Sequence, residues 1–227
     1  KVAVKHLITC CYFVLGNLLF IQTIGMPMGI DPAPFWANIY LYMYESKYIA
    51  NLTKINSSKE DKILAKRFHV TSRFIDDLLA LNDGGKFGKV HKKIYSKEMH
   101  LKKEHSGKRA TYLELDISVL HKIFVYKLFD KRDDFPFSIV KMPYLSSNIP
   151  YNIFYNTISS EILRIARCSL FYTDFLEKAR TLCSRMKRQG AEVIFSKTSL
   201  LRFLNNHSET FRKYNVPFKN IVDSCYN

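Results

Sequence analysis

Two adjacent aspartates, Asp76 and Asp77, are the side chains of this sequence best suited to metal chemistry. They lie in an otherwise apolar run, where each carboxylate disfavours ionisation of the other. A divalent cation removes that conflict, because Mg²⁺ binds a few carboxylate oxygens and leaves its other positions to water and phosphate oxygens. Two such ions, about 3.5–4 Å apart, can activate a hydroxyl and stabilise a leaving pyrophosphate. Taken alone, an Asp-Asp pair is equally suited to a plain polar hairpin turn.

A glycine-containing loop precedes the aspartates by about 45 residues, and it contains Gln22, Gly25, Pro27, Met28 and Gly29. Its glycines permit a backbone that approaches a ligand closely. A helix that begins behind the loop would direct its N-terminal amides at a phosphate or sugar. The alternative interpretation of this loop is a turn in the core before a buried helix. The combination of the loop, the helix and the Asp pair at this interval is much rarer than any one of them, and it favours the ligand-binding interpretation.

The charge of the chain favours a polyanionic partner. Thirty-five Lys and Arg stand against 20 Asp and Glu, which gives a formal net charge of +15. Contacts with phosphates release counterions, so such a chain binds nucleic acid at modest salt. The alternative is a basic protein with no specific partner. Many of the cations follow the Asp pair, and a solvated face is the other interpretation of that run: Lys86, Lys89, Lys92, Lys93, Lys97, Lys102, Lys103, Lys108 and Arg109.

The elements that must position these residues follow from periodicity and turn signals. We expect a helix that ends at about Val14, a turn at Gly16-Asn17 and a strand over 18–22. Proline in a first turn predicts a helix from Pro34 to about residue 54. Further along, two short strands over 71–81 should flank the Asp pair, an amphipathic helix should carry Phe87, Val90 and Ile94, and a pair of strands should occupy 112–128.

Beyond a loop over 131–150, the pattern becomes helical. Ile158, Ile162, Ile165 and Ala166 mark the buried face of a first helix. A second helix should begin at a cap formed by Asp174 with Glu177 and end at Gly190. A third should run over 199–214. This part adds further cations, namely Arg164, Arg167, Arg180, Arg185, Lys187 and Arg188.

Five cysteines without a CxxC pair predict reduced thiols and an intracellular location, either nuclear or cytoplasmic. The apolar run over 7–24 is long enough for a membrane span. Gly16-Asn17 in its middle, Gln22 near its end and the glycine loop after it favour a helix, a turn and a short strand instead, so we expect no membrane partner.

The motifs together resemble the reverse transcriptase family. The stretch over 22–29, with Pro34 and Ala37-Asn38, is similar to its motif B, and Phe74-Ile75-Asp76-Asp77 is similar to its aromatic-x-Asp-Asp motif C. The run over 86–106 lies where motif D follows, and 124–128 where the primer-grip motif E follows. The likeness covers about residues 17–130. The stretch over 128–150 resembles reverse-transcriptase-related frames of animal mobile elements, near the Penelope-like branch.

This resemblance implies an α+β fold, with a palm-like antiparallel sheet and packed helices over 1–145 and a helical thumb-like region over 146–227. It implies DNA synthesis from deoxynucleoside triphosphates on a primed RNA or DNA template, with two Mg²⁺ ions. Asp76 would be the main metal ligand and Asp77 would assist. Gln22, Gly25, Pro27, Met28 and Gly29 would shape the nucleotide and template pocket. Lys102 or Lys103 would be the general acid, and nucleic acid would contact Lys86, Lys89, Lys93, Lys108 and Arg109.

One departure limits the resemblance. Motif A of the family supplies another metal-binding aspartate upstream of motif B, yet none of the residues before Gln22 is acidic. We therefore expect a fragment that lacks motif A and the fingers and is inactive alone. It is either a piece of a longer enzyme or a decayed copy. The rival interpretation is a non-catalytic, nucleic-acid-binding remnant, and template preference, sugar selectivity and oligomeric state stay open.

Overall fold

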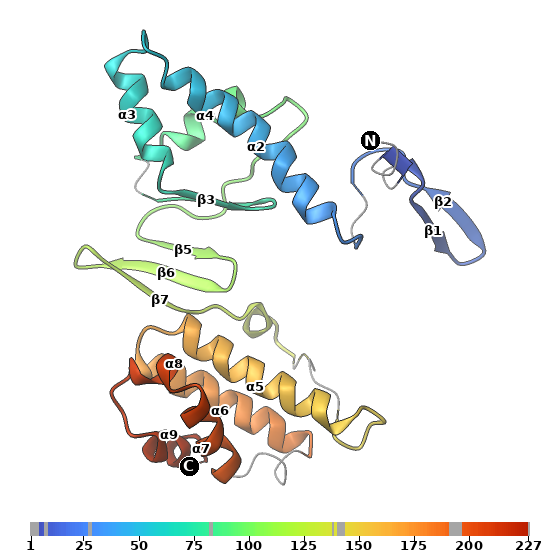
Figure 1. Cartoon of the computed structure of the whole chain (residues 1–227), viewed down its shortest axis with the longest axis vertical. Coiled ribbons are helices and arrows are strands. Elements are labelled where there is room, and N and C mark those ends of the chain that lie inside the picture. The colour runs from blue at the N-terminus through green and yellow to red at the C-terminus, as the bar shows by residue number, and fades with distance from the viewer. Residues whose placement is uncertain are drawn as a thin grey trace. The chain divides into compact units, whose positions relative to one another are not determined.

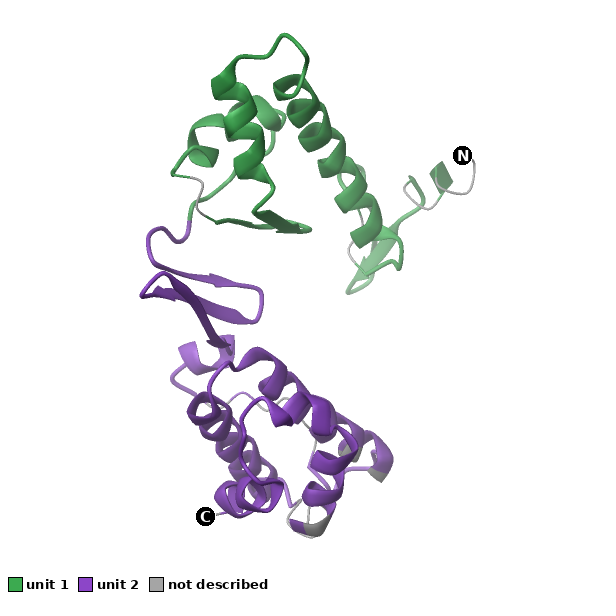
Figure 2. Cartoon of the chain, turned by 60° about the vertical axis from the view of Figure 1, so that its left-hand side comes forward, with its two compact units in different colours: residues 1–103 green, residues 104–227 purple. Residues whose placement is uncertain are grey.

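The protein is an α+β chain of two compact units, residues 1–103 and 104–227 (Figures 1 and 2). The structure is a computed structural model that describes residues 5–6, 9–26, 29–81, 84–137, 139, 144–190 and 197–226. Its sheets are small and antiparallel. The division at residue 104 groups the later strands with the C-terminal helices, whereas the sequence placed them with the preceding region. The palm-like and thumb-like regions stay a prediction.

The first unit begins with a hairpin of two short strands, β1 (Tyr12–Leu15) and β2 (Leu18–Ile21), joined by Gly16-Asn17. The predicted turn and second strand are confirmed. The predicted helix is confirmed at residues 5, 6 and 9, but its extension to Val14 is wrong, because residues 12–15 pair with β2 instead. Bulky β-formers in this segment, such as Tyr12 and Phe13, favour a strand over the helix that we inferred from apolar spacing.

Three helices and a second hairpin complete the first unit. Helix α2 (Ala33–Leu52) confirms the predicted helix, and it is followed by α3 (Lys59–Phe68), the hairpin β3 (Thr71–Phe74) and β4 (Asp77–Ala80), and α4 (Phe87–Ile94). Helix α3 was missed, although Ser58 is a cap signal: its hydroxyl accepts a hydrogen bond from the Asp61 amide at 3.1 Å. Edge-to-face contacts of Phe68 with Tyr48 and Phe87 join the three helices.

The second unit opens with a three-stranded sheet in the order β5–β6–β7: β5 (Arg109–Tyr112), β6 (Leu115–Leu120) and β7 (Ile123–Leu128). The alternation of apolar and polar residues predicted a pair of strands over 112–128, so one strand was missed. The turn between β6 and β7, His121-Lys122, has positive φ at both residues, 48° and 68°. Such two-residue turns match the twist of a hairpin, but these residue types are uncommon there and give a weak sequence signal.

Helices make up the rest of this unit: η1 (Lys131–Asp134), α5 (Tyr151–Cys168), α6 (Tyr172–Arg188), α7 (Lys197–Asn206), α8 (Ser208–Arg212) and α9 (Phe218–Tyr226). Gly190 follows α6 with φ 82°, as its predicted stop requires. The predicted cap by Asp174 is wrong, since Phe171 occupies the N-cap position and Asp174 lies in the first turn. The single predicted helix over 199–214 is broken near His207, and α9 was not foreseen.

The hydrophobic core that the structure describes belongs to the second unit. The four residues predicted for the buried face of α5, Ile158, Ile162, Ile165 and Ala166, are at most 3% exposed. They pack with side chains of α6 to α9 and with Leu128 at the end of β7. The spacing of apolar residues therefore identified the face that this helix buries.

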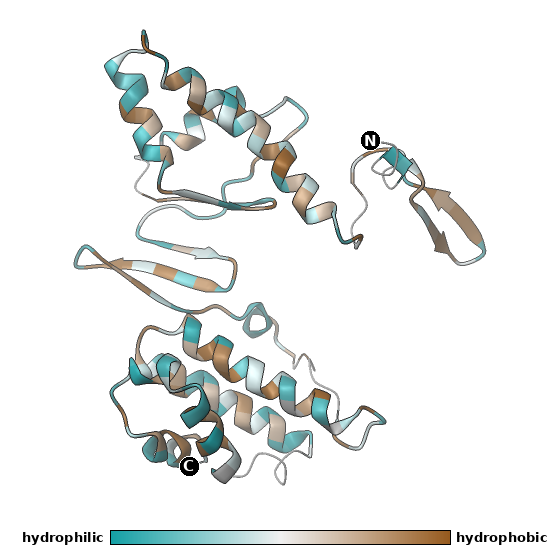
Figure 3. Ribbon diagram, in the orientation of Figure 1, coloured by the Kyte–Doolittle hydropathy of each residue, from teal (hydrophilic) through white to brown (hydrophobic). Residues whose placement is uncertain are grey.

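The β1–β2 hairpin consists of bulky apolar and aromatic residues, and Figure 3 colours its strands toward the hydrophobic end of the scale. Its eight strand residues are 40–69% exposed. Within the described part of the chain, no helix is long and apolar enough to cross a membrane.

Candidate metal-binding hairpin

Asp76 and Asp77 lie at the tip of the β3–β4 hairpin, as the sequence predicted. Phe74 pairs with Asp77, so Ile75 and Asp76 form a two-residue turn. Both aspartates are exposed, and neither forms an ion pair with a described residue. Two neighbouring carboxylates without a cationic partner suit Mg²⁺, which takes one or two carboxylates and completes its shell with water and phosphate oxygens.

The hairpin alone offers a partial ligand set. No group of three or more His, Cys, Asp or Glu side chains that could hold a metal occurs among the residues the structure describes. The chemistry of the two carboxylates therefore fits a cation that receives its other ligands from water, substrate or additional protein groups.

Arg73, on the strand before the turn, joins the hairpin to helix α2. Its Nε and Nη2 donate to the two carboxylate oxygens of Glu45, at 2.6 and 3.2 Å. Its Nη1 donates to Oδ1 of Asn38 at 2.7 Å, and Nη2 also donates to the Asn38 carbonyl oxygen at 3.2 Å. The Arg73 side chain is only 12% exposed. We call Asn38, Glu45 and Arg73 the Arg73 clamp.

The clamp also holds the backbone of the turn. The Ile75 amide donates to Oδ1 of Asn38 at 3.3 Å, and Nη1 of Arg73 donates to the Ile75 carbonyl oxygen at 3.3 Å. Ile75 has φ 54°, an outlier for a β-branched residue. The two peptide groups that flank this strained residue are thus each bound by a side chain of the clamp.

Tyr95 extends this network to the end of α4. Its hydroxyl donates to Oε1 of Glu45 at 2.7 Å. Burial raises the pKa of Tyr95, and the hydrogen bond to Glu45 raises it further. The hydroxyl therefore stays a donor at neutral pH, and Glu45 receives hydrogen bonds from both Arg73 and Tyr95.

The glycine loop adjoins α2, whose residue Asn38 reaches the hairpin. Within the loop, Gln22 donates to the Ile24 carbonyl oxygen at 3.0 Å, and Gly25 and Gly29 have φ of 83° and 95°. Pro27 and Met28 lie outside the described residues. No hydrogen bond joins Gln22, Gly25 or Gly29 to Asp76 or Asp77. The link between the two motifs that the structure describes runs through Asn38.

Most of the predicted nucleic-acid contacts are exposed lysines without ion pairs to described residues. Lys89 and Lys93 lie on α4, and Lys86 immediately precedes it. Lys108 lies outside regular elements, as do Lys102 and Lys103, the two candidates for the general acid. Arg109 differs, because it binds both carboxylate oxygens of buried Asp116, at 2.8 and 2.7 Å. Asp116 already neutralises the charge that we assigned to phosphate binding at this position.

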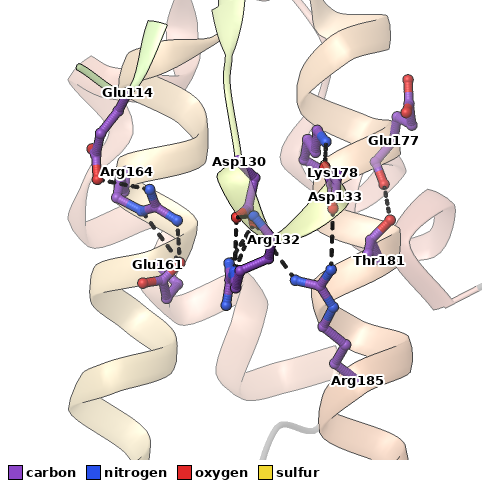
Figure 4. Close-up of polar contacts among 10 residues, drawn as sticks. All are labelled: Glu114, Asp130, Arg132, Asp133, Glu161, Arg164, Glu177, Lys178, Thr181 and Arg185. Carbon is purple, nitrogen blue, oxygen red and sulfur yellow. Dashed lines mark hydrogen bonds and ion pairs between the residues drawn. The ribbon is translucent and has the colours of Figure 1, made fainter. Parts of the chain in front are cut away.

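Several helical arginines are likewise engaged within the second unit (Figure 4). Arg164 pairs with Glu114 and Glu161, at 2.9 and 2.8 Å. Arg185 pairs with Asp133 at 3.4 Å and with Asp130 at 3.7 Å. These arginines attach the sheet and the segment after β7 to helices α5 and α6.

Sequence reasoning missed Glu45, Arg73 and Tyr95, and it named Asn38 without giving it a role in the turn. Arg73 lies 28 residues from Glu45 and 35 from Asn38, and Tyr95 lies 50 from Glu45. Pairs at such separations leave no periodic signal in one sequence. An arginine directly before the apolar residues Phe74 and Ile75 was the available hint, since a buried arginine requires a partner.

No protein-family model, curated protein or solved structure matches this chain.

Proposed function

We propose that this chain carries the palm and thumb regions of a reverse-transcriptase-type polymerase, which synthesises DNA on a primed RNA or DNA template. One observation above all supports the proposal. The adjacent carboxylates Asp76 and Asp77 lie at the tip of a hairpin that the Arg73 clamp ties to the helix behind a glycine loop. The resemblance to the reverse transcriptase family rests on the same three parts, namely the Asp pair, the helix and the glycine loop.

In the proposed site, Asp76 would hold Mg²⁺ and Asp77 would assist. Bound there, the ion would neutralise charge on the reacting phosphates and activate the primer hydroxyl. The hairpin would present its carboxylates, and the backbone of the glycine loop would contact nucleotide or template. Lys102 or Lys103 would supply a proton to the leaving pyrophosphate.

The test extends the reading frame upstream of Lys1 and assays the longer polypeptide with a primed template, deoxynucleoside triphosphates and Mg²⁺. We expect an aspartate in a short apolar strand upstream, and primer extension that Asp76→Asn reduces to background. Asp134→Asn is the matched control, because Asp134 is also exposed and also belongs to an Asp-Asp pair. The 227-residue chain alone should extend little, since it lacks one metal-binding carboxylate. Extension that persists in Asp76→Asn would refute the proposal.

The second candidate is a remnant that binds nucleic acid without catalysis. The exposed lysines on and around α4, which form no ion pair with the part of the chain that the structure describes, favour it. An upstream frame without an acidic residue in an apolar strand, together with salt-sensitive duplex binding, would select this candidate over the enzyme.

A further inference from the structure

The strained turn of the metal hairpin does not maintain its own conformation. A β-branched residue such as Ile75 at φ 54° has a strained backbone conformation. Asn38 binds the amide on one side of Ile75, and Arg73 binds the carbonyl on the other. Without these bonds the turn would relax, and the next two residues, Asp76 and Asp77, would change direction.

Arg73 affects the carboxylates through the backbone rather than by contact. In the hairpin register Arg73 pairs with Leu78, whereas Asp77 pairs with Phe74. Because successive side chains of a strand point to opposite faces, Arg73 and Asp77 lie on opposite faces of the hairpin. No hydrogen bond or ion pair joins Arg73 to Asp76 or Asp77; its hydrogen-bond partners are Glu45, Asn38 and the Ile75 carbonyl oxygen.

We propose that Arg73 is a positioning residue for the metal-binding carboxylates: held by Glu45 and Asn38, it keeps Ile75 in the conformation in which Asp76 and Asp77 converge on one cation. This inference rests on the proposed function. It adds that metal affinity depends on a cationic residue that does not touch the metal. Residues that orient metal ligands typically contribute about 10–100-fold to affinity.

The sign of the effect separates positioning from electrostatics. A positive charge near a cation site weakens binding, so removing it should by Coulomb's law tighten binding. Positioning predicts the opposite, a loss of affinity when the cationic Arg73 is replaced. Asn38→Ala gives a charge-neutral comparison, because it removes the acceptor shared by the Ile75 amide and Arg73.

The experiment is a Mn²⁺ titration of the 227-residue chain, followed by paramagnetic broadening of the Asp76 and Asp77 amide signals. Mn²⁺ suits the same carboxylate ligands as Mg²⁺. We expect Asp76→Asn to abolish the broadening, and Arg73→Met and Asn38→Ala each to weaken Mn²⁺ binding about tenfold. Lys66→Met, at an exposed lysine of α3 in the same unit, removes an equal charge and should not weaken it.

Two outcomes are distinguishable. A wild-type chain without Asp76-dependent broadening overturns this inference, whereas the proposed function is decided separately by primer extension with the longer polypeptide. Broadening that depends on Asp76 but is unchanged or tighter in Arg73→Met overturns the positioning role alone. The amide exchange of α3 shows whether each variant keeps the first unit folded. If Arg73→Met does not fold, the Mn²⁺ affinity of Asn38→Ala decides whether the Arg73 clamp positions the carboxylates.

Discussion

Asp130 illustrates how single residues stabilise the second unit. It follows β7 and accepts hydrogen bonds from the backbone amide and the guanidinium of Arg132, with Arg185 nearby (Figure 4). Burial alone would raise the pKa of Asp130, but the hydrogen bonds from Arg132 and the charges of Arg132 and Arg185 outweigh it and lower the pKa to about 2. The ionised carboxylate is therefore part of the folded structure.

A pH prediction follows for this residue. Because the pKa in the folded state is below the ordinary value of 3.8, the stabilisation is present above about pH 4 and is lost as the pH falls toward 2. The contribution at neutral pH is about 2 kcal/mol. Asp130→Asn should lower the free energy of unfolding at pH 6 and flatten its decline between pH 4 and 2, measured by urea denaturation. Asp134→Asn, at an exposed carboxylate, should keep the wild-type decline; an equally steep decline in Asp130→Asn would contradict this account.

At the scale of elements, α3 and α4 have similar numbers of cations but different surroundings. Helix α3 carries exposed Lys59, Lys62 and Lys66 together with Glu60 and Asp61. Helix α4 has no acidic residue in its sequence, and its lysines are exposed. A surface of one sign attracts a polyanion, whereas interspersed charges largely cancel beyond a Debye length.

We therefore predict that α4 contributes to nucleic-acid binding and α3 does not. Replacing Lys89, Lys92 and Lys93 by Gln should weaken duplex binding for all sequences alike. It should also flatten the plot of log K against log salt, by about 0.9 for each lysine that contacts a phosphate. The matched control replaces Lys59, Lys62 and Lys66 by Gln. Fluorescence anisotropy across a salt series measures both variants, and equal losses would show that only net charge matters.

For the molecule as a whole, the two units differ in how much they bury. The described hydrophobic core lies in the second unit, where Phe175 is 1% exposed and contacts the rings of Phe211 and Tyr214. In the first unit, by contrast, α2 exposes Phe35 at 65%. Each unit is compact by itself, which predicts separate stabilities.

Phe175→Ala should destabilise the second unit by about 3–5 kcal/mol, because it leaves a cavity in a packed core. Hydrogen exchange should accelerate in α5 and α6 and stay unchanged in α2 and α3. The matched control, Phe35→Ala, removes the same atoms from an exposed site and should leave the core of the second unit protected. Accelerated exchange in α2 upon Phe175→Ala would mean that the two units unfold together.

The sequence by itself determined the features that depend on local patterns. The Asp76-Asp77 turn between two strands, the helix from Pro34 and the buried stripe of α5 were all predicted from turn chemistry and periodicity. Each depends on residues within a few positions of one another, so a single sequence is sufficient. The wrong assignment of residues 12–15 belongs to the same class, since a short apolar run is compatible with helix and strand alike.

Only the tertiary structure decided which charges have partners. Arg109, Arg164 and Arg185 were counted with the free cations, yet each is bound by carboxylates. The Arg73 clamp likewise joins residues 28 and 35 positions apart. Composition gives the number of charged residues but not which of them form ion pairs. Pairing between residues so far apart in the sequence depends on how the elements pack. The physical reason is that an ion pair needs two side chains within about 4 Å, a condition that chain separation does not encode.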